Sequence, residues 1–258
     1  MQLDHAYPDG TYILDSNVSR TLLEKISHPE TTQPEFTKLV KKSYEYLFNF
    51  IIDQIYPQVE IATKSRMVEF HSEGNYKTEI CDRSISAVCV DLARAGMIPS
   101  QLFYEELHNF LPFQQIRQDH VYAARKTNDK NEVIGIDISG SKIGGGIDNA
   151  FVFIPDPMGA TGSTIAETIK IYKEKVEGKP ICFITAHLII TPEYVKKIKS
   201  THPDVKIFAL RLDRGLSTKK ALESKPGEFW DEEKGLNPHS YIVPGAGGVG
   251  EILNNSFV

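Results

Sequence analysis

The sequence has few of the residues that covalent or metal cross-links require. It contains three cysteines, Cys81, Cys89 and Cys182, and none of them forms a CxxC pair. An odd number of cysteines without metal-ligand spacing indicates reduced, buried thiols rather than a disulfide framework or a zinc site. The histidines also lack a spacing such as HExxH. No metal site built from protein side chains alone is therefore expected.

Long apolar runs and an excess of positive charge are also missing. No apolar stretch approaches the roughly 20 residues that span a bilayer. The first residues, MQLDHAYPDG, lack the basic and apolar regions of a signal peptide. These two absences predict a cytoplasmic protein that does not associate with membranes. The net charge of −5 argues against nucleic acid as a partner, although a local basic pocket for a small phosphorylated ligand remains compatible with it.

The N-terminal part differs in pattern from the rest. Residues 1–34 are mixed and rich in turn formers, which indicates an arm lying on the body. From Glu35 to Tyr56, apolar residues recur at helical spacing, and Pro34 and Pro57 bracket the run. This helix is expected to offer packing surface or a subunit contact. We therefore divide the chain into an arm and helix at 1–60 and a main domain at 61–258, expected to form one structural unit.

The main domain alternates strand-like and helix-like segments, which predicts an α/β fold with a mainly parallel sheet flanked by helices. Two strands around the turn TNDKN predict a β-hairpin flap. Ligands of such sheets bind outside the carboxyl ends of the strands. The expected strands are 85–92, 120–126, 133–139, 151–154, 181–190 and 205–212, and the expected helices are 99–110, 164–176 and 192–199.

The most informative segment runs from Phe151 to Val176, where an apolar strand, the loop DPMGATGST and a helical pattern follow one another. Small residues in the loop let the backbone approach a phosphate closely. The following helix adds backbone N–H groups and the positive end of its dipole. Thr164 and Glu167 have the spacing of a capping box. This pattern predicts a monophosphate-binding loop, although an ordinary capped strand–loop–helix connection shares the same geometry.

The letters of this loop are more specific than its geometry. Residues 156–164 resemble the DPMLATGGS loop of uracil phosphoribosyltransferases, with Gly159 in place of Leu and Ser163-Thr164 in place of Gly-Ser. Ala93-Arg94-Ala95-Gly96 resembles the RAG loop that receives pyrophosphate in that family. Residues 236–247, LNPHSYIVPGAG, resemble its LNxxxYIVPGxG base loop. The resemblance covers roughly Ile85 to the C-terminus.

The resemblance implies a phosphoribosyltransferase-like fold and a homodimer or higher homo-oligomer. It also implies a reaction between 5-phosphoribosyl pyrophosphate (PRPP) and uracil, with Mg²⁺ bound mainly through PRPP. It implies Arg94 and Asp156 as catalytic residues, with Arg94 on pyrophosphate. Arg125 is implied as a second phosphate-binding arginine, for which Arg117 is the competing candidate. The implied PRPP-binding loop is Asp156, Pro157, Met158, Gly159, Ala160, Thr161, Gly162, Ser163 and Thr164, and the implied uracil-binding residues are Tyr241, Ile242, Gly247, Gly248 and Val249.

The chain departs from the family pattern at two places. The family continues its base loop as GxGDxGD, whereas this chain has Gly248 at the first Asp position and only Glu251 for the second. The missing carboxylate would lie close to base and PRPP. A polar insertion at 215–234 also precedes the base loop, and it is expected to form either a lid or an inert surface loop.

Residues 245–250 read G-x-G-x-x-G, but too few residues follow to build a dinucleotide-binding unit. Three functions therefore remain open. The first is a uracil phosphoribosyltransferase that makes UMP. The second is a PRPP- or nucleotide-binding homologue without uracil turnover, which the loss of Asp at Gly248 would favour. The third is a phosphoribosyltransferase for another base.

Overall fold

The computed structural model describes residues 2–127 and 133–256, with 124–127 and 133–137 described as backbone alone. Its main sheet has the strand order β1-β10-β9-β7-β4-β5-β6, and a short β8 pairs with β9. Every pairing is parallel except β5 with β6. The strands are β1 (Thr11–Ile13), β4 (Ser86–Ala93), β5 (Ile116–Thr127), β6 (Val133–Lys142), β7 (Ala150–Pro155), β8 (Met158–Gly159), β9 (Cys182–Ile190) and β10 (Lys206–Leu212).

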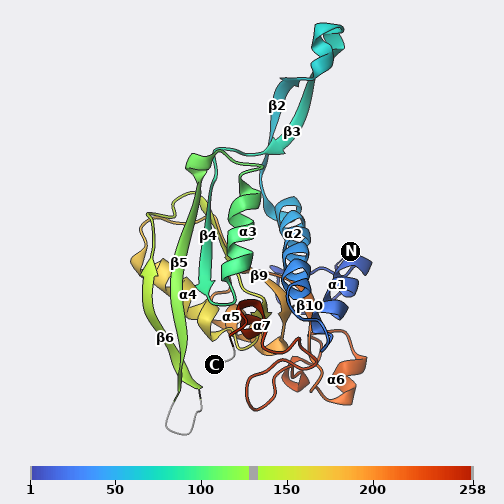
Figure 1. Cartoon of the computed structure of the whole chain (residues 1–258), viewed down its shortest axis with the longest axis vertical. Helices are drawn as coiled ribbons and strands as arrows, with labels where there is room; N and C mark the ends of the chain where they lie inside the picture. The colour runs from blue at the N-terminus through green and yellow to red at the C-terminus, as the bar shows by residue number, and fades with distance from the viewer. Residues whose placement is uncertain (1, 128–132, 257–258) are drawn as a thin grey trace.

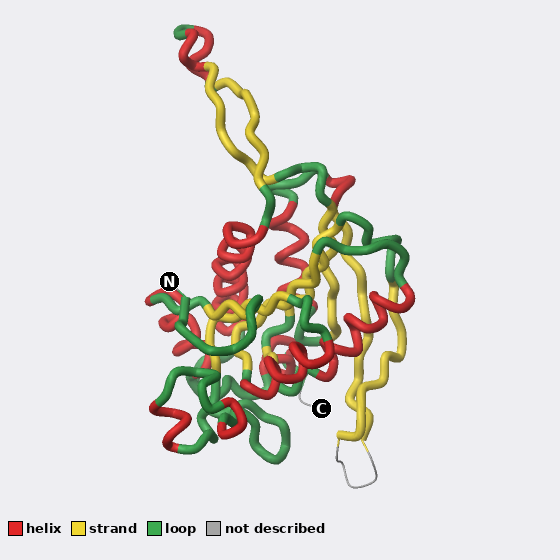
Figure 2. Tube along the Cα trace, turned by 180° about the vertical axis from the view of Figure 1, so that it is seen from behind, coloured by secondary structure: helices red, strands yellow, loops and turns green. Residues whose placement is uncertain are grey.

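Helices cover both faces of this sheet (Figures 1 and 2). On one face lie α1 (Asn17–Ser27), α2 (Glu35–Ile55) and α3 (Met97–Leu107), and on the other α4 (Ser163–Lys175) and α5 (Pro192–Thr201). Successive strand residues point to opposite faces, so Cys89 and Phe153 join the first core while Val88 and Val152 join the second. The mainly parallel α/β sheet and the β5–β6 hairpin are thus as predicted, although most of TNDKN lies outside the described residues. Within the described ranges, no helix is both long and apolar enough to cross a membrane.

The N-terminal 34 residues are more regular than their composition indicated. Strand β1 extends the sheet edge by pairing with β10. Helix α1 follows, and Ser16 and Ser19 form a reciprocal capping box at its start. The sequence interpretation missed both elements because β1 has only three residues and because turn formers lie on either side of α1.

A second hairpin was not predicted at all. Among the described residues, strands β2 (Gln58–Lys64) and β3 (Asn75–Cys81) pair only with each other, and the ribbon projects away from the rest of the molecule (Figure 1). Two 3₁₀ turns, Arg66–Glu69 and Ser72–Gly74, form its tip. Because every residue of β2 is exposed or half-exposed, its sequence QVEIATK carries no buried apolar run by which a strand could be recognised. We call residues 58–81 the hairpin arm.

The insertion at 215–234 is folded onto the N-terminal segment. It contains α6 (Lys219–Glu223) and a 3₁₀ turn at Trp230–Glu232. The buried Glu233 carboxylate accepts hydrogen bonds from Tyr7 Oη, from Arg214 Nη1 at 2.7 Å and from Gly227 N at 2.9 Å. The Trp230 indole packs edge-on against Tyr7. These contacts hold the insertion against the N-terminal segment. The insertion is therefore a packed part of the fold and not a loosely attached surface loop.

This cluster predicts a stability effect. Replacing Glu233 by Ala would leave the largely buried Arg214 guanidinium without its carboxylate. Breaking a buried pair from one side costs about 3 kcal/mol or more. We expect urea denaturation to show a free energy of unfolding lower by about that amount. The matched control is Glu228→Ala, at an exposed residue of the same insertion, which is expected to change it by less than about 0.5 kcal/mol. Equal stability of the two variants would show that the cluster does not anchor the insertion.

Candidate active site

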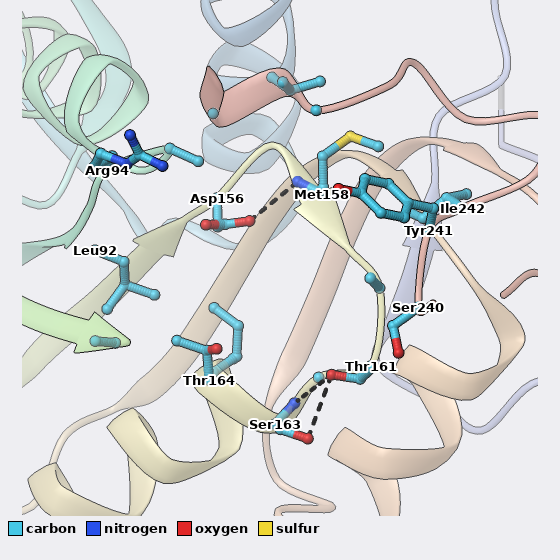
Figure 3. A pocket seen from close by; sticks show the side chains of 18 of the residues that line it. Leu92, Arg94, Asp156, Met158, Thr161, Ser163, Thr164, Ser240, Tyr241 and Ile242 are labelled. Carbon is cyan, nitrogen blue, oxygen red and sulfur yellow. Dashed lines mark hydrogen bonds between the residues drawn. The ribbon is translucent and has the colours of Figure 1, made fainter. Parts of the chain in front are cut away.

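The candidate site lies where β4 and β7 end. These strands are parallel neighbours, with Cys89 opposite Phe153, so their carboxyl ends meet at one edge of the sheet. Arg94 directly follows β4, and Asp156 directly follows β7. A cavity of about 810 Å³ opens here. Figure 3 shows Arg94 at one side of it, Tyr241 and Ile242 at the other, and Asp156 between them.

The loop from Asp156 to Thr164 forms a wall of this cavity. Asp156 Oδ1 accepts the Met158 N–H at 3.1 Å, which turns the chain after β7. Gly162 has a left-handed φ of 76° and immediately precedes α4, a conformation that glycine adopts without steric cost. The first N–H groups of a helix have no partner within it. Thr161, Gly162, Ser163 and Thr164 therefore bring hydroxyl and amide groups together at a positive helix end.

The predicted capping box at this helix is wrong. Helix α4 begins at Ser163 rather than Thr164, and Gly162 caps it without a side-chain hydrogen bond. Thr164 instead lines the cavity, and the Glu167 carboxylate lies 3.7 Å from Lys170 on the same helix. The reason is the left-handed Gly162, which serves as the N-cap two residues before the Thr164 that the Thr-x-x-Glu spacing indicated.

A buried His–Tyr pair holds the Asp156–Thr164 loop on the side of β9. His187 of β9 is fully buried, and its Nδ1–H donates to the Asp156 carbonyl at 2.6 Å. Since Nδ1 donates, Nε2 accepts from the Tyr194 hydroxyl at 2.7 Å. Burial lowers the pKa of His187 to about 3, so this tautomer is neutral. Thr191, at the start of α5, donates from Oγ1 to the Ala160 carbonyl at 2.7 Å and ties a second point of the loop.

Gly159 is explained by this packing. A Cβ at this position would lie 2.8 Å from Ile190 Cγ2 and 3.1 Å from the Tyr194 ring. The Tyr194 ring therefore occupies space that a larger residue at 159 would need, which accounts for glycine where the resembling loop has leucine. Gly159 pairs with Ile190 in the sheet, and the Pro157 carbonyl accepts from Leu188 and Ile189, so both residues shape the loop from behind the cavity.

The three candidate arginines have different positions. Arg94 lines the cavity, and its Nη1 donates to Ser256 Oγ at 3.0 Å. Arg125 lies on β5 opposite Ile136 in the flap, and its side chain is outside the described residues. Arg117 makes two bonds to the buried Asp119, at 2.9 and 3.1 Å, and a third to the Gly146 carbonyl. That engagement ties β5 to the 144–146 turn and is evidence against Arg117 as the second phosphate-binding arginine.

The predicted base loop forms the far side of the cavity. Asp213, at the end of β10, accepts the Gly245 N–H at 2.7 Å and holds Arg211 in a bidentate pair. The Glu193 carboxylate of α5 accepts from Gly235 N and Leu236 N. These two carboxylates fix the loop at its entry and exit. The loop residues that line the cavity are Ser240, Tyr241, Ile242, Gly247, Gly248, Val249 and Gly250.

The structure thus brings most of the predicted site residues to one cavity: Arg94, Asp156, Met158, Ala160, Thr161, Gly162, Ser163 and Thr164 from the PRPP side, and Tyr241, Ile242, Gly247, Gly248 and Val249 from the base side. Pro157 and Gly159 do not line it. Sequence reasoning missed Tyr194, Ser240 and Glu251 as lining residues. Tyr194 belongs to no motif, whereas the adjacency of Ser240 to Tyr241 in the base loop was a usable signal.

Two carboxylates, Asp156 and Glu251, line the cavity. Over residues 2–127 and 133–256, no group of three or more His, Cys, Asp or Glu side chains gathers in a way that could hold a metal ion. Mg²⁺ commonly binds through one or two carboxylates together with substrate phosphates and water. The donor set of the cavity fits an ion that arrives with a diphosphate.

A parallel sheet with an antiparallel flap and a cavity at the strand ends, walled by a small-residue loop and a helix N-terminus, defines a phosphoribosyltransferase-type protein. A family model described as uracil phosphoribosyltransferase matches residues 13–232. The chain therefore belongs to the uracil phosphoribosyltransferase family. The match ends before the base loop, so residues 236–250 are outside it.

Two relatives and one solved structure are similar to this chain over nearly its whole length. A uracil phosphoribosyltransferase of Fervidobacterium nodosum is 28% identical over 94% of this chain and 97% of its own length. One from Mycoplasma genitalium is 27% identical over 90% of this chain and 92% of its own. The structure of the AQ2163 protein from Aquifex aeolicus superposes with a TM-score of 0.69 at 20% identity, over 94% of this chain and 97% of that one. At that identity the superposition shows a shared fold.

The buried histidine predicts a pH-dependent stability. His187 titrates near 6.5 when unfolded and near 3 when folded, so its contribution is present above pH 6.5 and is lost as the pH falls toward 3. We compare the protein with His187→Asn, which keeps a donor near the Nδ1 position. The stability advantage of the unchanged protein over the variant is expected to shrink by about 2 kcal/mol between pH 7 and pH 5.

Urea denaturation at the two pH values measures this difference. The control is Tyr194→Phe, which removes the Tyr194 hydroxyl and retains the His187 imidazole. The difference in unfolding free energy between this variant and the unchanged protein should vary little with pH. If the difference for His187→Asn is the same at both pH values, His187 does not titrate as a buried neutral group.

Proposed function

We propose that the protein transfers the 5-phosphoribosyl group from PRPP to uracil, giving UMP and pyrophosphate. The observation that carries this proposal is the three-sided cavity, in which Arg94, the 161–164 loop and the 240–250 loop face a common space with Asp156 between them. Anionic groups at two ends of PRPP match two of these sides, and a flat base matches the third. Family membership supports the same reaction.

The 5-phosphate would bind at the N-terminus of α4, where Thr161, Ser163 and Thr164 line the cavity. Amide and hydroxyl donors at such a helix end suit a phosphate dianion. Asp156 would accept hydrogen bonds from the ribose hydroxyls. Arg94 would bind the pyrophosphate, because a guanidinium offers a planar set of donors to phosphate oxygens. Arg125, on the flap, is proposed as the second arginine of this subsite.

The base would lie against the 240–250 loop. Tyr241, Ile242, Gly247, Gly248 and Val249 are proposed to contact uracil, the glycines allowing close approach of the backbone. Asp213 and Glu193 hold the loop in place from outside the cavity. A prearranged loop places the base nitrogen near the ribose without a further ordering cost, which raises the rate through orientation.

In this reaction the C1–O bond of PRPP breaks, C1 bonds to a ring nitrogen of uracil, and the proton of that nitrogen leaves with the pyrophosphate. Positive charge develops on the ribose and negative charge on the departing pyrophosphate as the C1–O bond breaks. Arg94 stabilises the leaving charge through hydrogen bonds in a cavity partly screened from water. Asp156 would be the protein oxygen donor for an Mg²⁺ ion held mainly by the pyrophosphate, and such an ion would supply positive charge against the same leaving group. The protein needs no nucleophile of its own. A cytoplasmic location goes with this proposal, because the charged substrate and product do not cross membranes readily.

A radiolabelled assay tests the function: purified protein with PRPP, Mg²⁺ and uracil is scored for UMP. We expect UMP, and we expect Arg94→Ala to lower kcat by at least roughly 100-fold, the loss typical for a donor to developing charge. The matched control is Arg83→Ala, an exposed arginine before β4 at the opposite end of the strand, which should retain activity. PRPP binding without UMP formation would instead indicate a binding homologue or another base.

We also propose that the protein forms a homodimer through the hairpin arm. A two-stranded ribbon is at best marginally stable in water by itself, and this one pairs with no other strand of the described chain. Its tip exposes 74% of Phe70 and 50% of Met67. A second copy of the chain, offering its own arm or body, would cover these side chains in a closed two-fold assembly.

Light scattering coupled to gel filtration tests the assembly. The unchanged protein is expected at twice the mass of one chain. The double variant Phe70→Asp, Met67→Asp should shift toward the monomer, because it places charges in an apolar contact. Glu73→Gln, at the same tip, should remain dimeric. A monomer in all three samples, or a dimer in all three, would contradict this role of the arm.

A further inference from the structure

The carboxylate of Glu251 occupies the space where a side chain at Gly248 would lie. A Cβ built on Gly248 would be 2.9 Å from Glu251 Cδ and in closer contact still with Oε2. Both atoms belong to the far end of the flexible Glu251 side chain, so a side chain at position 248 would displace the carboxylate from its present place. Both residues line the cavity on the base-loop side. The absence of a side chain at 248 and the position of the Glu251 carboxylate are therefore two parts of one arrangement.

The backbone explains how Glu251 reaches this place. Helix α7 (Val249–Asn254) begins directly after Gly248, so Glu251 lies in its first turn. Side chains on a helix lean toward its N-terminus and over the residue three or four positions earlier. For Glu251 that residue is Gly248. A glutamate here returns its carboxylate to the loop, whereas an alanine or a short polar residue would end before it.

Helix α7 is held firmly enough to fix this geometry. Val249 and Leu253 are buried in the core beneath it. A Cβ on Gly250 would lie 3.3 Å from Ala95 Cβ, so the first turn packs closely on the loop that carries Arg94. At the other end, Gln33 Nε2 donates to the Ile252 carbonyl at 2.9 Å. The Glu251 side chain thus starts from a positioned backbone rather than from a loose tail.

The Glu251 carboxylate has no protein partner in the part of the chain that the structure describes: no hydrogen bond or ion pair to its side chain is present there. The side chain is half-buried in the cavity wall. A partly desolvated carboxylate gains from a hydrogen-bond donor. A donor brought by the ligand would satisfy it, and on this side of the cavity the proposed ligand is the base.

We propose that Glu251 is a base-contacting residue whose carboxylate accepts a hydrogen bond from a ring N–H of uracil, in place of a side chain at position 248. This inference rests on the proposed function, because it assumes uracil at the 240–250 loop. A hydrogen bond to a charged group contributes about 1.5–3 kcal/mol. Removing the carboxylate should therefore lower kcat/KM for uracil by about 10- to 150-fold.

A relocation experiment tests the proposal. Glu251→Ala removes the carboxylate and keeps a good helix former, and it is expected to raise KM for uracil while KM for PRPP stays unchanged. Gly248→Asp combined with Glu251→Ala places a carboxylate in the vacated space from the other residue, which has an ordinary φ of −79°. This double variant should recover activity relative to Glu251→Ala. Gly248→Asp alone should lose activity, since two carboxylates then compete for one space.

The remaining outcomes distinguish the proposed role of Glu251 from the proposed function of the protein. Glu228→Ala, on the exposed insertion, serves as the control and should match the unchanged protein. UMP formation by the unchanged protein with an unaltered kcat/KM for uracil in Glu251→Ala would overturn the role of Glu251 and leave the function standing. An equal rise of KM for both substrates would overturn it as well, since it indicates a collapsed cavity. No UMP from the unchanged protein would overturn the proposed function, and this inference with it.

Discussion

The parallel pairing of β4 with β7 is the constraint on which the site depends. It brings the two strand ends to one edge of the sheet, so that Arg94 and Asp156 emerge side by side although 62 positions separate them in the chain. Neighbouring β9 places His187 under the Asp156 carbonyl. Arg94, Asp156 and His187 are thus positioned by strands that are buried on both faces. The loops form the remaining walls of the cavity.

The supporting contacts are polar and either fully or partly buried, and this gives them their effect. His187, Asp213 and Glu193 each use a side chain to hold a backbone group of a cavity loop. In a low-dielectric interior an unsatisfied partner is costly, so such bonds favour one loop conformation strongly over its alternatives. The insertion is held by the same means, with Glu233 joining it to the N-terminal segment. None of its residues from 215 to 234 lines the cavity, which is evidence against a lid in this conformation.

The sequence predicted the central strands and helices because their residues are buried and therefore periodic. Strand β7 is buried along its whole length, and the loop after it carries recognisable letters. The hairpin arm escaped detection because its strands are exposed and carry no continuous apolar run, although β3 alternates Tyr76, Thr78 and Ile80 with polar residues. Tyr194 and His187 could not be assigned to the site either, since their roles arise from contacts between β9, α5 and the loop, across distances in sequence that no local pattern encodes.

The base side shows how a motif and a structure carry different information. In the sequence comparison, Gly248 replaces one acidic residue of the motif, and Glu251 replaces a second with another acidic residue. Read as geometry, the glycine makes room and the first turn of α7 directs the glutamate into that room. A negative charge is thus present at this wall although position 248 has no side chain. A count of matching positions treats the two changes as independent losses, whereas in the role that we propose for Glu251 one change compensates for the other.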